Sequence, residues 1–162
     1  MVGSASLRER ALAVLQGVTD PEIPVLTIAD LGVLRDVQVN GDVVEVTITP
    51  TYSGCPAMNM IRLDIETALA RAGLKSRIKT TLSPAWTTDW LTEAARQKLA
   101  AYGIAPPEHS TSRRALFAQP QPTCPRCHST DTELISEFGS TACKSLHRCR
   151  ACREPFDAFK CH

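Results

Sequence analysis

The sequence of this 162-residue chain lacks the features that would place it in or beyond a membrane. No apolar run approaches the roughly 20 residues that a membrane-spanning helix needs. The first residues, MVGSASLRERALAV, have neither the basic start nor the long apolar core of a secretory signal. We therefore expect a soluble, cytoplasmic protein with no membrane partner.

Signatures of nucleic-acid binding and of two cofactor classes are missing as well. The formal net charge is only +1, so no basic excess predicts a nucleic-acid partner. No E-x-x-H pair is present for a di-iron site on helices. No G-x-G-x-x-G motif is present for a dinucleotide. The chain therefore gives no direct sign of oxygenase chemistry of its own.

Cysteine is nearly missing from the first 123 residues and is concentrated after them. Only Cys55 precedes residue 124, and the other six of the seven cysteines follow. A tail of about 40 residues buries too little apolar surface to fold alone, so it usually needs disulfides or a metal. In a reducing cytoplasm, paired cysteines more often bind metal.

Two C-x2-C pairs in this tail, Cys124 with Cys127 and Cys149 with Cys152, are separated by 21 residues. Each pair can form a tight turn that presents two thiolates, and two such turns close a tetrahedron around Zn²⁺. We expect one structural zinc per chain. A catalytic zinc is not expected, because four thiolates leave no open position. Iron also suits a tetrahedral S₄ site, and the spacing does not separate the two metals.

Two further cysteines of the tail, Cys143 and Cys161, are not needed by a four-thiolate site. They are either small apolar side chains on neighbouring strands or a second soft-metal or redox site. The sequence contains no third C-x2-C pair, which favours the packing role.

The first 103 residues carry alternating helix and strand signals. Ser6 with Glu9 forms a capping box before apolar residues at helical spacing. Asn40-Gly41 is typical of a type I′ turn between two valine-rich strands, which predicts a hairpin. Pro56 suits the first position of a second helix. The predicted elements are helix 6–18, strands 33–39 and 42–48, helix 56–72, strand 75–82 and helix 87–103.

This α-β-β-α-β-α order predicts a small α+β domain with helices packed on a three-stranded sheet. Residues 104–123 contain four prolines and several Ser and Thr, which is typical of a linker. We therefore expect a domain at 1–103, a Pro-rich linker at 104–123 and a zinc-ribbon-like β domain at 124–162. The ribbon strands are expected near 132–138, 143–149 and 154–161.

Cys55 stands in a loop just before the second predicted helix. The free N–H groups and positive dipole at a helix start favour a thiolate, so Cys55 is a candidate reactive thiol or soft-metal ligand. It could equally be a small buried residue, and its position leaves both interpretations open. The acidic residues Asp20, Glu22 and Asp30 lie in one stretch with two prolines, and their spacing favours turn and capping roles.

Three stretches, DPEIPVLTIADLGVLRDV, TPTYSGCPAM and SPAWTTDWLTEAARQKL, resemble the SufT-like iron–sulfur assembly domain family over residues 5–103. With CPRCHS, ELISEFGSTACKSL and CREPFDAFKC added, the whole chain resembles the family of D subunits of bacterial phenylacetyl-CoA 1,2-epoxidases. The resemblance implies an accessory subunit in aerobic phenylacetate degradation. It also implies that the di-iron, flavin and iron–sulfur centres of that system belong to other subunits.

The resemblance assigns roles to individual residues. Cys55 matches the family's reactive cysteine, Asp20 and Glu22 match its acidic DPE signature, and Thr51 lies in the loop of Cys55. The four would surround one surface pocket and pass iron or an iron–sulfur cluster to the oxygenase or reductase subunits. Because a lone Cys55 cannot hold a cluster, the acids or a second chain's thiol, as in a homodimer, would complete the site.

Two other functions remain open at this point. The chain could be a purely structural or regulatory binding subunit of the epoxidase complex. It could also be a thiol oxidoreductase that uses Cys143 and Cys161.

Overall fold

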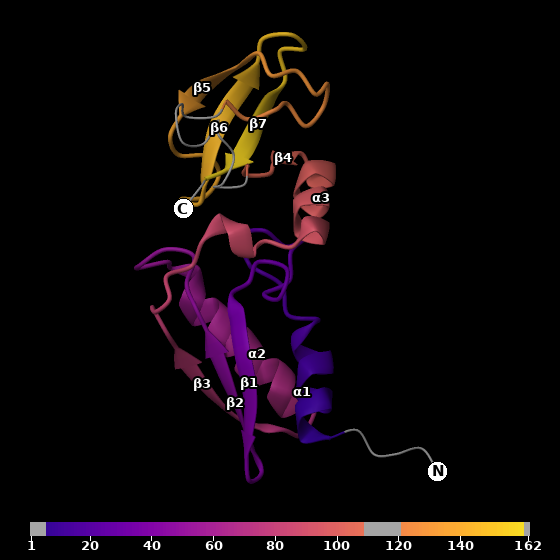
Figure 1. Ribbon diagram of the computed structural model, residues 1–162, viewed down its shortest axis with the longest axis vertical. Coiled ribbons are helices and arrows are strands. Elements are labelled where there is room, and N and C mark those ends of the chain that lie inside the picture. The colour runs from indigo at the N-terminus through magenta and orange to yellow at the C-terminus, as the bar shows by residue number, and fades with distance from the viewer. Residues whose placement is uncertain (1–5, 109–120, 161–162) are drawn as a thin grey trace, which may run out of the picture. The chain divides into compact units, whose positions relative to one another are not determined.

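A computed structural model describes residues 6–108 and 121–160 of the chain (Figure 1). It divides into two compact units, Met1–Trp86 and Thr87–His162, each with its own β-sheet. No helix within the described part is long and apolar enough to span a membrane.

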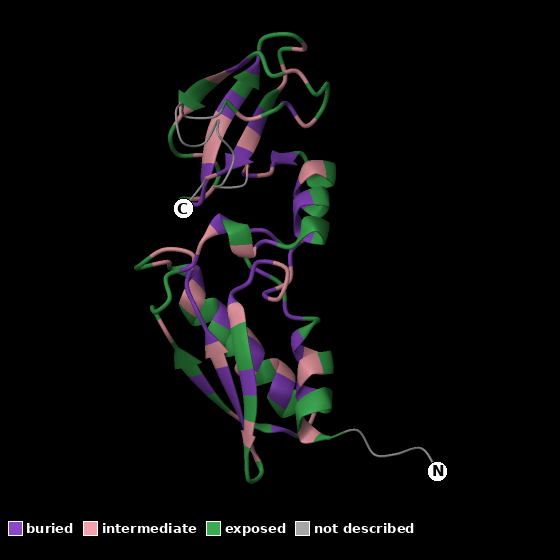
Figure 2. Ribbon diagram, in the orientation of Figure 1, coloured by how far each residue is buried: buried purple, intermediate pink, exposed green. Residues whose placement is uncertain are grey.

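The N-terminal unit is a three-stranded sheet with two helices. Its elements are α1 (Leu7–Leu15), β1 (Leu34–Asn40), β2 (Val43–Ile48), α2 (Ala57–Arg71) and β3 (Lys75–Thr80). The strand order is β1-β2-β3, with β1 antiparallel and β3 parallel to β2. Val46 lies opposite Val37 and Ile78, and this buried row forms the core with α1 and α2. Buried segments recur along these strands and helices (Figure 2). The predicted order of these elements is confirmed.

Local signals fix most element ends in this unit. The Ser6–Glu9 capping box is present, with Glu9 N–H donating to Ser6 Oγ at 3.2 Å and Ser6 N–H donating to Glu9 Oε2 at 2.7 Å. The hairpin turn differs from the prediction, because pairing continues to Asn40 and leaves Gly41 and Asp42 as the loop. Only Gly41, with φ 62°, has a positive φ there, as in a type II′ turn.

The C-terminal unit contains the predicted ribbon strands and additional elements. These are η1 (Thr88–Trp90), α3 (Glu93–Tyr102), β4 (Ile104–Ala105), β5 (Thr132–Ser136), β6 (Lys144–Cys149) and β7 (Pro155–Phe159). The strand order is β4-β7-β6-β5; β6 is antiparallel to both neighbours, and β4 is parallel to β7. The strands predicted near 132–138, 143–149 and 154–161 correspond to β5, β6 and β7.

The single helix predicted at 87–103 is wrong, because two threonine caps divide it. Thr87 Oγ1 accepts from Asp89 N–H at 3.3 Å and starts the short 3₁₀ helix η1. Leu91 is extended, and Thr92 Oγ1 then accepts from Ala95 N–H at 3.0 Å and starts α3. Pro56 likewise stands one residue earlier than predicted, at the N-cap of α2.

The C-terminal unit begins at Thr87, before the segment 104–123 that was predicted as a linker. Ile104 and Ala105 fall in the predicted linker but pair with Asp157 and Ala158 of β7. The buried guanidinium of Arg96, on α3, donates to the backbone carbonyls of Thr88, at 3.0 Å, and Pro107. Helix α3 and strand β4 therefore group with the ribbon.

Candidate metal centre and cysteine loop

The two C-x2-C pairs of the ribbon adopt matching turns. The N–H of Cys124 donates to Ser129 O at 2.9 Å, and the N–H of Cys149 donates to Glu154 O at 2.9 Å. The first turn precedes β5 and the second joins β6 to β7. Each C-x2-C pair is therefore closed by a backbone hydrogen bond from its first cysteine.

The residue after each pair has a left-handed backbone. His128 has φ 61° and Arg153 has φ 63°, and no other non-glycine residue in the described ranges has a positive φ. This conformation costs on the order of 1–3 kcal/mol per residue, so it persists where the surroundings enforce it. Both strained positions lie directly beside the cysteine cluster.

The four thiols converge on one point. The Sγ atoms of Cys124, Cys127, Cys149 and Cys152 all lie within 4.8 Å of one another. The Cys124–Cys152 and Cys127–Cys149 Sγ distances are 3.8 and 3.5 Å, so none of the four forms a disulfide with another. A tetrahedral site with Zn–S bonds of about 2.3 Å has sulfur–sulfur distances of about 3.8 Å, so the arrangement fits such an ion.

The cluster has a buried side and an open side. Cys124 and Cys149 are fully buried against Ala105, Phe156 and Ala158, whereas Cys152 is half-buried and Cys127 is exposed. Two ligands are therefore anchored in the apolar core of the ribbon, and two face outward.

Hydrogen bonds, burial and neighbouring thiols give Cys149 and Cys152 different pKa values. The backbone N–H of Cys152 points at Cys149 Sγ, 3.5 Å away, and lowers the pKa of Cys149 to about 7. The backbone N–H of Glu154 favours the Cys152 thiolate, but burial and the adjacent thiols raise the pKa of Cys152 to about 12. Neighbouring thiolates repel one another, so all four ionise together only around a cation.

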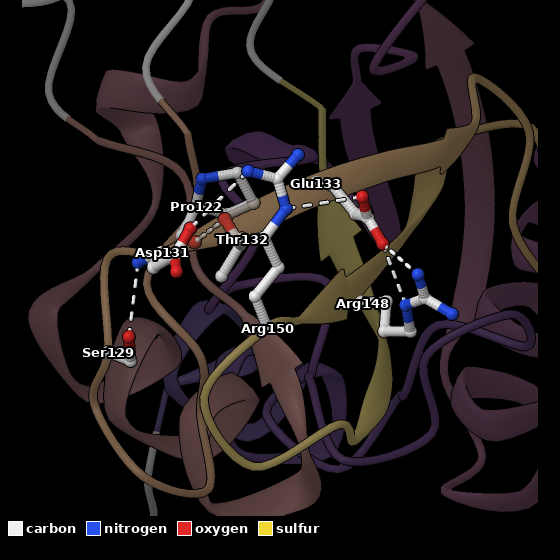
Figure 3. Close-up of polar contacts among 7 residues, drawn as sticks. All are labelled: Pro122, Ser129, Asp131, Thr132, Glu133, Arg148 and Arg150. Atoms are coloured by element: carbon white, nitrogen blue, oxygen red, sulfur yellow. Dashed lines mark hydrogen bonds and ion pairs between the residues drawn. The ribbon is translucent and has the colours of Figure 1, made fainter.

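Polar contacts fasten the first cysteine turn to the sheet (Figure 3). Thr132 Oγ1 donates to Pro122 O at 2.8 Å, and Asp131 N–H donates to Ser129 Oγ at 3.1 Å.

Glu133 accepts from Arg148 Nε at 2.7 Å and from Arg150 Nε at 3.2 Å. These arginines hold the pKa of Glu133 below its ordinary value. An ion pair between Arg126 and Glu154 joins the two turns directly.

The other cysteine of interest, Cys55, lies where the sequence placed it, immediately before α2. Its side chain is half-buried, its N–H donates to Tyr52 O at 3.3 Å, and its carbonyl accepts from Met58 N–H at 3.3 Å. Pro56 provides no side-chain cap for α2, and no acidic residue occupies the first turn. The thiol is thus partly accessible at a helix start whose own first turn contains no acid. Thr51, also half-buried, lies in the same loop.

The carboxylate of Asp20, in the DPE stretch, stabilises a backbone turn. Asp20 is buried, and its Oδ1 accepts from the N–H groups of Glu22 and Ile23, each at 2.8 Å. Thr27 and Asp30 cap each other a few residues later. The turn and capping roles predicted from spacing are therefore present for Asp20 and Asp30.

Within residues 6–108 and 121–160, only the four ribbon cysteines form a group of three or more Cys, His, Asp or Glu ligands close enough to share a metal. Cys55, Asp20 and Glu22 do not form such a group by themselves. Cys143 is buried, with its Sγ 3.0 Å from Thr141 Oγ1, and Cys161 lies outside the described residues.

Sequence reasoning missed the supporting residues of the metal centre. The hydrophobic pattern gave no sign of the contact between Arg126 and Glu154. It also gave no sign of the left-handed backbone of His128 and Arg153. Their one common mark is adjacency to a C-x2-C pair.

Family models match both parts of the chain. Residues 8–79 match the family described as iron-sulfur cluster assembly protein, and residues 108–160 match the PaaD zinc beta ribbon domain. The two matches fall on the cysteine loop and on the four-cysteine cluster, respectively.

Similar proteins agree with this division. A protein of Escherichia coli (strain K12), named as the D subunit of 1,2-phenylacetyl-CoA epoxidase, is 51% identical over 92% of this chain and 90% of its own length. A protein of Porphyromonas gingivalis, named an Fe-S protein maturation auxiliary factor, is 38% identical over 56% of this chain and 89% of its own. A DUF59 domain structure from Bacillus anthracis matches with TM-score 0.53 and 25% identity, covering 57% of this chain and 90% of that one.

Proposed function

Because this chain belongs to the PaaD-like family of phenylacetyl-CoA epoxidase D subunits, we propose that it is an accessory subunit that assembles or delivers iron or an iron–sulfur cluster to its partners. The partners are the oxygenase or reductase subunits of the epoxidase system. The support is the combination of an iron–sulfur assembly domain with a zinc ribbon in one chain. Relatives of the first domain alone carry names of Fe–S maturation factors.

The single observation that carries this proposal is that Cys55 is not one of the four clustered ribbon thiols and belongs to the other unit. The four ribbon thiols saturate one tetrahedral site, whereas Cys55 is half-buried in a loop of the other unit. In the proposed role, the Cys55 thiolate is a transient ligand for the iron or cluster that is passed on. Asp20, Glu22 and Thr51 would act with it as polar or additional ligand groups.

One thiol cannot retain a cluster, so Cys55 suits transfer better than storage. A second Cys55 from a homodimer, or a thiol of the client protein, would complete the ligand set. In the ribbon, Cys124, Cys127, Cys149 and Cys152 would hold one zinc, which supplies the folding energy that a short β domain lacks. The folded ribbon would then recognise the client.

The test compares iron loading of the epoxidase subunits produced together with the wild-type chain or with Cys55→Ala. The matched control is Ser53→Ala, an exposed position in the same loop. We expect Cys55→Ala to leave about one zinc per chain in place while the iron content and turnover of the client subunits fall. Normal iron loading with Cys55→Ala, together with stable co-purification, would show instead a purely structural or regulatory subunit.

A further inference from the structure

The N-terminal sheet has an apolar face and a polar face. Val44, Val46 and Ile48 of β2 are fully buried on the side of α1 and α2. Side chains alternate along a strand, so the residues between them point to the opposite side. That side is lined by Asp36, Gln38 and Asn40 of β1, Glu45 and Thr47 of β2, and Lys75, Arg77 and Lys79 of β3.

Three cations form a row along β3 on this polar face. Lys75, Arg77 and Lys79 occupy alternate positions, and all three are exposed. Alternate residues of a strand stand about 6–7 Å apart, so the row repeats at the spacing of side chains on a neighbouring strand.

The acid that pairs with two of these cations is nearly covered. Glu45 lies beside Arg77 in the register and accepts from Arg77 Nη1 at 3.2 Å and from Lys79 Nζ at 2.6 Å. Its side chain is 10% exposed, whereas those of Arg77 and Lys79 are 67% and 55% exposed. Glu45 therefore fixes Arg77 and Lys79 in place while their own side chains remain exposed, and Lys75 pairs instead with the exposed Asp42.

The two edges of this sheet are not equivalent. On β1, Arg8 Nε donates to the carbonyl of Val37 at 3.0 Å, and a bulge interrupts pairing between Leu34 and Asp36. On β3, the outer side has no strand partner among the described residues. Cations on an open edge discourage neutral or basic strands from pairing with it. A strand with acidic side chains is attracted to these cations instead of being repelled by them.

We propose that β3 is a docking edge for an extended acidic segment of a partner protein, which adds as a fourth strand and places its carboxylates against Lys75, Arg77 and Lys79. Backbone hydrogen bonds along the edge supply the pairing, and the cation row selects acidic residues at alternate positions. This surface lies on the sheet and is independent of whether Cys55 transfers metal.

The test titrates the full chain with a ten-residue peptide that alternates Glu and Thr, followed by NMR of the backbone amides. We expect shifts and slowed amide exchange along residues 75–80. Lys75→Thr and Arg77→Thr should each weaken binding about threefold, the size of one cross-strand charge pair. The matched control is Arg71→Ala, which removes an exposed cation from α2 and should leave the affinity for the peptide unchanged. Because the partner of Lys75, Asp42, is itself exposed, Lys75→Thr also leaves the fold intact.

Two further peptides separate strand addition from charge attraction. A Glu–Thr peptide methylated on alternate backbone nitrogens keeps its charges but cannot pair along the edge, and it should not slow exchange in β3. A Lys–Thr peptide should not bind. Equal binding of the methylated peptide, binding of the Lys–Thr peptide, or absence of any response at 75–80 would each overturn the proposal.

Discussion

At the scale of single residues, Glu45 shows how a carboxylate can stay charged in a nearly covered position. Its hydrogen bond from Lys79 and the nearby Arg77 lower its pKa and outweigh the opposing effect of burial. A carboxylate with a depressed pKa in the folded state stabilises the fold above its unfolded pKa, about 4.3. That contribution is lost as the pH falls through the folded pKa.

We therefore predict that Glu45→Gln lowers the free energy of unfolding at pH 7, and that the loss disappears as the pH falls below the folded pKa. Urea unfolding of both proteins between pH 7 and pH 3 would measure this. Glu66→Gln is the control, because Glu66 forms an exposed pair with Arg62 on α2 and should show little loss at any pH. An equal loss of the free energy of unfolding at pH 7 and at pH 3 would contradict a stabilising role for the charged Glu45 carboxylate.

At the scale of elements, capping decides where helices begin. Ser6 and Glu9 start α1, and Thr92 starts α3 after the separate turn that Thr87 initiates. The side chain of each capping residue accepts a hydrogen bond from a backbone N–H that the helix itself leaves without an acceptor.

We predict that Thr92→Ala costs about 1 kcal/mol of stability, because the N–H of Ala95 loses its acceptor. Thermal unfolding of the full chain would measure the loss. The control is Gln97→Ala, at an exposed position within the same helix, which should cost nearly nothing. Similar losses in the two variants would speak against a capping role for Thr92.

Much of the architecture could be predicted from local patterns. The valine alternation predicted β1 and β2, and the apolar spacing predicted α1 and α2. The helix across 87–103 could not be divided correctly, since Thr87 and Thr92 both suit helix starts and only packing separates η1 from α3. Strand β4 could not be predicted from the sequence for another reason. Two residues carry no periodicity, and Ile104–Ala105 becomes a strand only through pairing with distant β7.

The candidate sites were predictable to different extents. The convergence of Cys124, Cys127, Cys149 and Cys152 follows from spacing alone, because each pair is local and only two pairs need to meet. The position of Cys55 just before α2 also follows from the sequence, but no local pattern indicates which other loops lie near it. Spacing could suggest only a turn role for Asp20, and the structure shows that role in its bonds to Glu22 and Ile23.

At the scale of the whole molecule, the two units have different sources of stability. The N-terminal unit is built around fully buried aliphatic side chains such as Leu15, Ile65 and Leu69. The cluster of buried residues at the ribbon cysteines is small, and two of its members, Cys124 and Cys149, are metal-ligand candidates. The ribbon should therefore depend on metal far more than the first unit does.

We predict that a strong chelator, or Cys124→Ser, removes protection from amide exchange in β5, β6 and β7 but leaves β1, β2 and β3 protected. The free energy at stake is large, since structural zinc binding is worth on the order of 10 kcal/mol. Exchange followed by NMR or mass spectrometry distinguishes the strands. Cys55→Ala serves as the control and should keep its zinc and its protection. Simultaneous loss of protection in both sheets would contradict this separation.

The pairing of β4 with β7 also determines how the ribbon can be isolated. The family match begins at residue 108, after Ile104–Ala105 has already joined the sheet. A fragment cut at that boundary would retain every candidate metal ligand yet strip the neighbouring strand from Asp157 and Ala158. Its newly bared sheet edge would invite self-association. A fragment beginning near Thr87 would keep η1, α3 and β4, and with them the natural cover of that edge.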